Sequence, residues 1–131
     1  MQNKLSEKKR FTIVGRMRSM SHAFRGLWII FKTGHSIWIG CFFAAIAIFL
    51  SFILKISEME WIVIIFCIGI TLSAEGFNTA IEIDIDLTSP EYHPYARDTK
   101  DVAAGAVIIV SIMSGIIGFI IFLPKILNLL V

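Results

Sequence analysis

Charged residues are scarce in this sequence: they make up 17% of the chain, whereas 56% of the residues are hydrophobic and the mean hydropathy is +0.80. A water-soluble domain of this size needs more polar side chains to cover its surface. The two cysteines, Cys41 and Cys67, lie inside apolar runs, so nothing indicates a disulfide framework or a zinc site. The composition predicts a single membrane domain over residues 1–131.

Basic residues are concentrated towards the N-terminus. The formal net charge is only +2, but eight of the twelve basic residues precede position 33. Basic residues that flank a first membrane span are retained on the cytoplasmic side, so the N-terminus is expected in the cytoplasm. Such a cluster also attracts anionic lipid headgroups. A basic segment beside an apolar span is the usual topology signal, so a nucleic acid partner is not expected.

Long uncharged runs predict an all-α integral membrane protein with three transmembrane helices, at residues 37–54, 61–81 and 102–123. A basic tail at 1–10 comes first. Apolar residues then recur at helical spacing over 11–33, which is typical of an amphipathic helix on the membrane surface. Small residues are frequent in the third span, so we expect it to pack closely against other helices.

The segment from residue 83 to 101 is the only long polar segment after the N-terminal region. Thr88 or Ser89, before Pro90, is expected to start a helix, and Glu91 lies at capping-box distance from Thr88. Asp98 and Thr99 are alternative caps for the helix that follows. With a cytoplasmic N-terminus, two crossings return the chain to the cytoplasm at this segment.

Polar side chains gather on one face of the second span. At about 100° per residue, they fall within a stripe about 100° wide if the helix continues past residue 81; these residues are Glu75, Asn78, Thr79, Glu82 and Asp86. Carboxylates near hydrocarbon are costly and need compensation. Three explanations are open: carboxylates that reach water at the interface, a metal-held phosphate site, or an ion path. Lys100 and Asp101, which enter the third span at the same depth, favour the phosphate site.

The motifs resemble one family, the small bacterial integral-membrane lipid kinases, which comprise diacylglycerol kinase and the undecaprenol kinase of Gram-positive bacteria. The matching text is AEGFNTAIE at 74–82, Asp86, PEYHP at 90–94 and KDVAAGAV at 100–107. The spacing is specific, and a looser likeness extends over residues 11–123. PEYHP and VAAGAV look more like the undecaprenol branch.

The resemblance implies a homotrimer in the bacterial cell membrane, whose protomers each have three spans and an N-terminal surface helix. It implies transfer of the γ-phosphate of ATP, with Mg²⁺ as cofactor, to the hydroxyl of a membrane lipid at the cytoplasmic interface. Undecaprenol is favoured over diacylglycerol as this lipid.

Residue roles follow from the same resemblance. Glu75 matches the general base that takes the proton of the lipid hydroxyl, and Asn78 the residue that helps to position that hydroxyl. Glu82 matches the ligand of Mg²⁺. The matches to nucleotide-binding residues are Lys100, Asp101 and His93. Phosphoryl transfer needs this kind of positioning, charge neutralisation and proton acceptance.

One position departs from the family pattern. The family's surface helix ends in a Thr-Glu-Arg-Asn-like stretch whose Glu is a second metal ligand, but here Gly34 stands at that place. His35, Asp86 and Asp84 are the candidate replacements; Asp84 lies about 200° around the helix from Glu82, and Mg²⁺ prefers oxygen to imidazole. The alternatives to an active kinase are a catalytically weakened family member that binds lipid or regulates, and an ion-conducting bundle.

Overall fold

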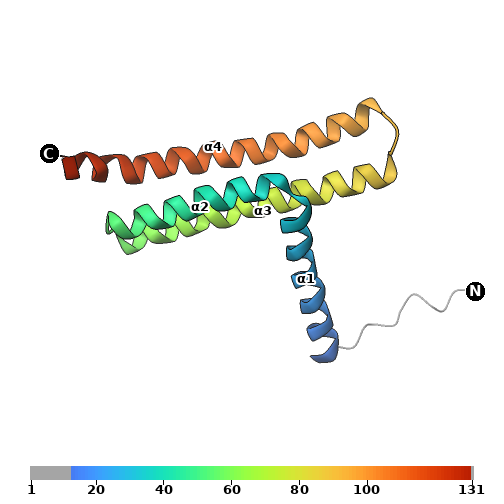
Figure 1. Cartoon of the computed structure of the whole chain (residues 1–131), viewed down its shortest axis with the longest axis horizontal. Coiled ribbons are helices and arrows are strands. Elements are labelled where there is room, and N and C mark those ends of the chain that lie inside the picture. The colour runs from blue at the N-terminus through green and yellow to red at the C-terminus, as the bar shows by residue number, and fades with distance from the viewer. Residues whose placement is uncertain (1–12, 131) are drawn as a thin grey trace, which may run out of the picture.

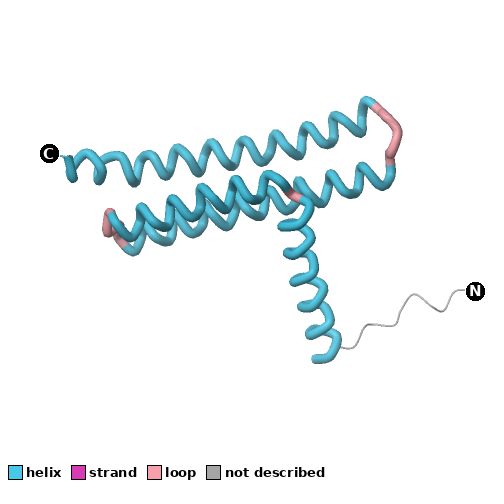
Figure 2. Tube along the Cα trace, viewed as in Figure 1, coloured by secondary structure: helices cyan, strands magenta, loops and turns pink. Residues whose placement is uncertain are grey.

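The computed structural model describes residues 13–130, and within them every regular element is a helix (Figure 2). The helices are α1 (Ile13–Thr33), α2 (His35–Ile53), α3 (Glu58–Thr88) and α4 (Pro94–Leu130). Helices α2, α3 and α4 run alongside one another, and α1 projects away from them (Figure 1). The basic tail at 1–10 and the first two residues of the expected surface helix lie outside the described residues.

Three of these helices, α2, α3 and α4, are long and apolar enough to cross a membrane. Their outer faces carry large exposed apolar side chains, among them Phe42, Phe66 and Phe119. A small buried cluster joins α3 to α4 near the α2–α3 turn and consists of Ile56, Ile64, Ile121 and Phe122. Apolar side chains that face outwards along a bundle suit hydrocarbon and not water, so the predicted all-α membrane fold with three spanning helices is confirmed.

Helix α1 is separated from α2 by the single non-helical residue Gly34. The side chain of Trp38 fixes this elbow, because its Nε1 donates to the carbonyl oxygen of Phe31 at 3.1 Å and the two rings meet edge to face. Met17, Phe24 and other apolar residues of α1 are exposed. An unpaired apolar face on a helix that leaves the bundle is what an interfacial helix presents to lipid.

The turn between α2 and α3 is closed by polar contacts. Ser57 caps α3: its hydroxyl accepts from the backbone N–H of Glu60, whose carboxylate accepts from the backbone N–H of Ser57 at 2.7 Å. Lys125 of α4 pairs with the same carboxylate at 3.0 Å. This reciprocal cap and ion pair bind the far end of α4 to the turn. Lys55, just before the cap, has a positive φ of 47°.

Helices α3 and α4 extend further than the spans expected within them. Helix α3 continues seven residues past position 81 to Thr88, so the capping box predicted at Thr88 and Glu91 is wrong. Thr88 instead ends α3, where its hydroxyl donates to the carbonyl oxygen of Asp84 at 2.8 Å. Helix α4 begins at Pro94, a residue suited to a first helical position, and not at Asp98 or Thr99. The polar stripe therefore lies on one uninterrupted helix.

Candidate active site

An apolar cavity of about 500 Å³ lies between α2, α3 and α4. From Ile64 to Glu75 it follows three turns of α3, about 16 Å at 1.5 Å per residue. Its walls are almost wholly aliphatic and aromatic, with Phe43 from α2 and Phe122 from α4. The cavity has the length and character to accept a hydrocarbon chain.

Glu75 is the one charged residue among the residues that line this cavity. The residue is 8% exposed; α3 is mainly apolar before it and carries Asn78 and Thr79 on the turn after it. Thr79, one turn further along, donates from its hydroxyl to the carbonyl oxygen of Glu75 at 3.0 Å. The carboxylate thus stands where an apolar cavity meets the polar continuation of α3.

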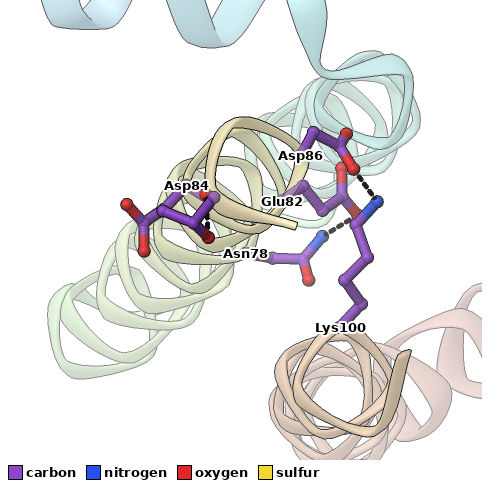
Figure 3. A network of polar contacts seen from close by, with 6 residues as sticks. Asn78, Glu82, Asp84, Asp86 and Lys100 are labelled. Atoms are coloured by element: carbon purple, nitrogen blue, oxygen red, sulfur yellow. Dashed lines mark hydrogen bonds and ion pairs between the residues drawn. The ribbon is translucent and has the colours of Figure 1, made fainter. Parts of the chain in front are cut away.

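A polar cluster, which comprises Asn78, Glu82, Asp86 and Lys100, continues from this point along α3 (Figure 3). Asn78 is 7% exposed, and its Nδ2 donates to Oε1 of Glu82 at 2.9 Å. The Oδ1 of Asn78 is buried and accepts no hydrogen bond within the described part of the chain. Burying an amide oxygen without a donor is unfavourable, so this atom is available to a ligand.

Lys100 joins the polar cluster from α4. Its Nζ lies 2.5 Å from Oδ1 of Asp86, which ties the end of α3 to the start of α4. Figure 3 shows Glu82 and Asp86 on the side of α3 that faces Lys100, whereas Asp84 points to the opposite side. Asp84 is therefore not placed to replace a missing ligand beside Glu82.

Two of the residues expected at the nucleotide have partners outside this cluster. Asp101 pairs with Arg97 at 3.6 Å, and its side chain is 69% exposed. His93 is exposed in the α3–α4 loop, with its ring near that of Tyr95. The structure thus brings together Asn78, Glu82 and Lys100, with Glu75 one turn away, and leaves the other two at the surface.

Sequence reasoning missed a polar contact in the wall of the cavity. The hydroxyl oxygens of Thr71 on α3 and Ser114 on α4 lie 3.0 Å apart. Both residues line the cavity in the half that leads to Glu75. In the sequence, each of these residues is a hydroxyl side chain within an apolar run. The sequence does not indicate that the two side chains come into contact.

Comparison with known proteins shows the family of this chain. The family model described as prokaryotic diacylglycerol kinase matches residues 21–122. The chain belongs to this family. Members of this family named in the comparison are lipid kinases, so the chain is a membrane lipid kinase.

Three relatives give the range of similarity. An undecaprenol kinase of Bacillus subtilis is 40% identical over 82% of this chain and 88% of its own length. A diacylglycerol kinase of Synechocystis is 32% identical over 86% of this chain and 65% of the relative. A diacylglycerol kinase of Haemophilus influenzae is 30% identical over 77% of this chain and 86% of the relative. One of these relatives is thus named for undecaprenol and two are named for diacylglycerol.

The polar cluster fits Mg²⁺ only as part of a site that a nucleotide completes. Within residues 13–130 no group of three or more His, Cys, Asp or Glu side chains is placed to hold a metal ion. Mg²⁺ at nucleotide sites is commonly held by one or two carboxylates together with phosphate oxygens and water. The Glu82 carboxylate is one such ligand, and the unpaired Oδ1 of Asn78 is a further oxygen on the adjacent turn. They suit an ion shared with a nucleotide.

Proposed function

We propose that this lipid kinase transfers the γ-phosphate of ATP to the hydroxyl of a long-chain membrane lipid, with Mg²⁺ as cofactor and undecaprenol as the favoured acceptor. One observation carries the proposal: the buried carboxylate of Glu75 lines an apolar cavity between three helices, and Asn78 of the polar cluster follows one turn later on α3. A lipid tail needs an apolar environment and a nucleotide needs a polar one. In this chain the two environments adjoin at Glu75.

In this proposal the lipid tail lies in the cavity and its hydroxyl reaches Glu75. A carboxylate within hydrogen-bond reach of that hydroxyl can take its proton as the hydroxyl oxygen bonds to the γ-phosphorus, while the bond from the γ-phosphorus to the β–γ bridging oxygen breaks and ADP leaves. Asn78 holds Glu82 in place through its amide and leaves its own Oδ1 for the hydroxyl or the metal ion. Mg²⁺ bound at Glu82 would supply charge neutralisation of the phosphates.

In this proposal the nucleotide lies on the side of Glu82 away from the cavity, near the start of α4. Lys100 provides an ammonium for its phosphates, as Lys does at many phosphate sites. Asp101 and His93 are exposed close to this region of the chain and are assigned to the nucleotide by the family motif. Because both side chains are exposed, they would contact a part of ATP that is itself accessible to water.

The choice of undecaprenol rests on two supports. The PEYHP and VAAGAV stretches resemble the undecaprenol branch of the family, and the undecaprenol kinase of B. subtilis shares 40% identity with this chain. The aliphatic cavity by itself discriminates weakly between long apolar tails, because methylene contacts differ little in energy.

The cellular setting is part of the same proposal. The kinase is placed in the bacterial cell membrane with its N-terminus, the α3–α4 loop and the polar cluster on the cytoplasmic side, where ATP is available. It acts as a homotrimer, which would cover part of the exposed apolar surface of the bundle and the small residues of α4.

A phosphate-transfer assay tests the proposal. Purified protein in lipid vesicles receives γ-labelled ATP with undecaprenol, with diacylglycerol or with no added lipid, each with Mg²⁺ or with EDTA. We expect Mg²⁺-dependent label in the lipid fraction, more with undecaprenol than with diacylglycerol. No labelled lipid in any arm would overturn the proposed function, and equal or greater labelling of diacylglycerol would overturn the choice of acceptor.

A further inference from the structure

Lys100 faces two carboxylates on α3 and contacts one of them. Glu82 and Asp86 are four residues apart and lie on the same side of the helix (Figure 3). The ammonium of Lys100 pairs with Asp86 at 2.5 Å, and Glu82 pairs instead with the amide of Asn78 at 2.9 Å. The two contacts leave Glu82 free of any cation of this chain among the described residues.

A phosphate site needs Lys100 and Glu82 to have separate partners within the protein. A lysine side chain is flexible, and its ammonium moves to whichever carboxylate in reach attracts it. If Lys100 paired with Glu82, the ammonium and the metal-binding carboxylate would neutralise each other, and neither would serve the nucleotide. Asp86, at the water-exposed end of α3, offers Lys100 a partner one turn away from Glu82.

We propose that Asp86 is a positioning residue: it holds the Lys100 ammonium at the boundary of α3 and α4 and keeps it off Glu82. The pair is partly exposed, with 35% of the Lys100 side chain and 68% of the Asp86 side chain accessible. The contact with Asp86 uses one of the three N–H donors of the ammonium, so the others can bind phosphate oxygens while Lys100 stays in place. The inference rests on the proposed function, since it concerns how this chain receives ATP.

Asp84 provides a matched control on the same helix. It carries the same charge two residues away, but its carboxylate points to the side of α3 away from Lys100 (Figure 3). Loss of the Asp84 charge changes the general electrostatic field at this end of the helix without changing the partner of Lys100. Any effect specific to Asp86 must therefore come from its contact.

A competing role for Asp86 is that of a metal ligand in place of the carboxylate absent at Gly34. The two roles differ in the absence of Mg²⁺. A metal ligand has no effect on nucleotide binding in EDTA, whereas a residue that positions Lys100 still affects it. The roles also differ in the Lys100→Met background, where a positioning residue has nothing left to position.

The experiment measures the Kd of ATP in EDTA by equilibrium dialysis, together with kcat and KM for ATP in Mg²⁺, on the full chain in lipid vesicles. The variants are Asp86→Asn, Asp86→Glu, Asp84→Asn, Lys100→Met and the double variant of Asp86→Asn with Lys100→Met. Thermal unfolding of each variant checks that the bundle is intact.

We expect Asp86→Asn to raise the Kd in EDTA and the KM for ATP by about tenfold, the effect of losing one charge-assisted contact, with a smaller change in kcat. Asp86→Glu restores most of the affinity, and Asp84→Asn leaves it unchanged. In the Lys100→Met background, Asp86→Asn causes no further loss.

Two results would overturn the inference alone: an unchanged Kd in EDTA for Asp86→Asn, or an equal loss with and without Lys100. An unsubstituted protein that binds no ATP would overturn the proposed function as well.

Discussion

The hydroxyl oxygen of Thr79 lies 3.1 Å from the point where a Cβ on Gly34 would stand. The carbonyl oxygen of Ile30 lies still closer to that point, at 2.9 Å, a separation that Cβ atoms do not adopt. Gly34 thus lets the elbow between α1 and α2 come into contact with α3 beside Glu75. The missing carboxylate at this position has a steric reason in this chain: there is no room for a side chain.

Gly34→Ala is expected to lower the free energy of unfolding by about 1–3 kcal/mol, because overpacking forces backbone shifts. Thermal or denaturant unfolding in detergent measures the change, and we expect phosphate transfer to fall with it. Gly26→Ala is the matched control, since a Cβ there meets nothing within 4 Å and should stabilise α1 by up to about 1 kcal/mol. Gly34→Glu, if it raised activity, would contradict this account and support a weakened wild type.

Glu75→Gln keeps the size of the side chain and removes its capacity to accept a proton as a base. We expect the rate of lipid phosphorylation to fall by about 10²- to 10⁴-fold, the range for loss of a general base. ATP binding, measured by equilibrium dialysis, should be unchanged, because Glu75 faces the cavity and not Lys100. Glu58→Gln, at the other end of α3, is the control, and activity retained by Glu75→Gln would remove the assigned role.

Lys55 adopts a left-handed backbone conformation in the turn between α2 and α3, with φ of 47°. This conformation costs a residue with a Cβ about 1–2 kcal/mol of conformational free energy, and it costs glycine almost nothing. Lys55→Gly is therefore expected to raise the free energy of unfolding by about 1 kcal/mol, measured by denaturant titration. Lys55→Ala removes the charge but keeps the Cβ, and an equal gain from this variant would show that charge and not backbone strain is responsible.

The Thr71–Ser114 contact should couple α3 to α4 weakly. Interhelical hydrogen bonds in membrane proteins average about 0.6 kcal/mol in double-mutant cycles. We expect a coupling energy of that order from Thr71→Val, Ser114→Ala and the double variant, measured by unfolding in detergent. Strictly additive effects would show that the contact contributes nothing to the packing of the two helices.

The sequence predicted the elements of this fold because hydrophobic runs and helical periodicity are local properties of the chain. Three uncharged runs predicted three spanning helices, and the structure has them in α2, α3 and α4. The spacing from Glu75 to Asp86 predicted one polar face on condition that the helix continued past residue 81, and α3 does continue. The helix ends were predicted less well, because the capping pattern at Thr88 fits a helix end as well as a start.

The sequence by itself determined the membrane class, the number of spans and the face of the second span that carries the carboxylates, since each depends only on residue order and helix geometry. Tertiary structure alone decided that Lys100 meets Asp86 and not Glu82, that Gly34 lies against Thr79, and that Thr71 reaches Ser114. Such contacts depend on how neighbouring helices are rotated and aligned, and the packing of whole side-chain surfaces sets this alignment.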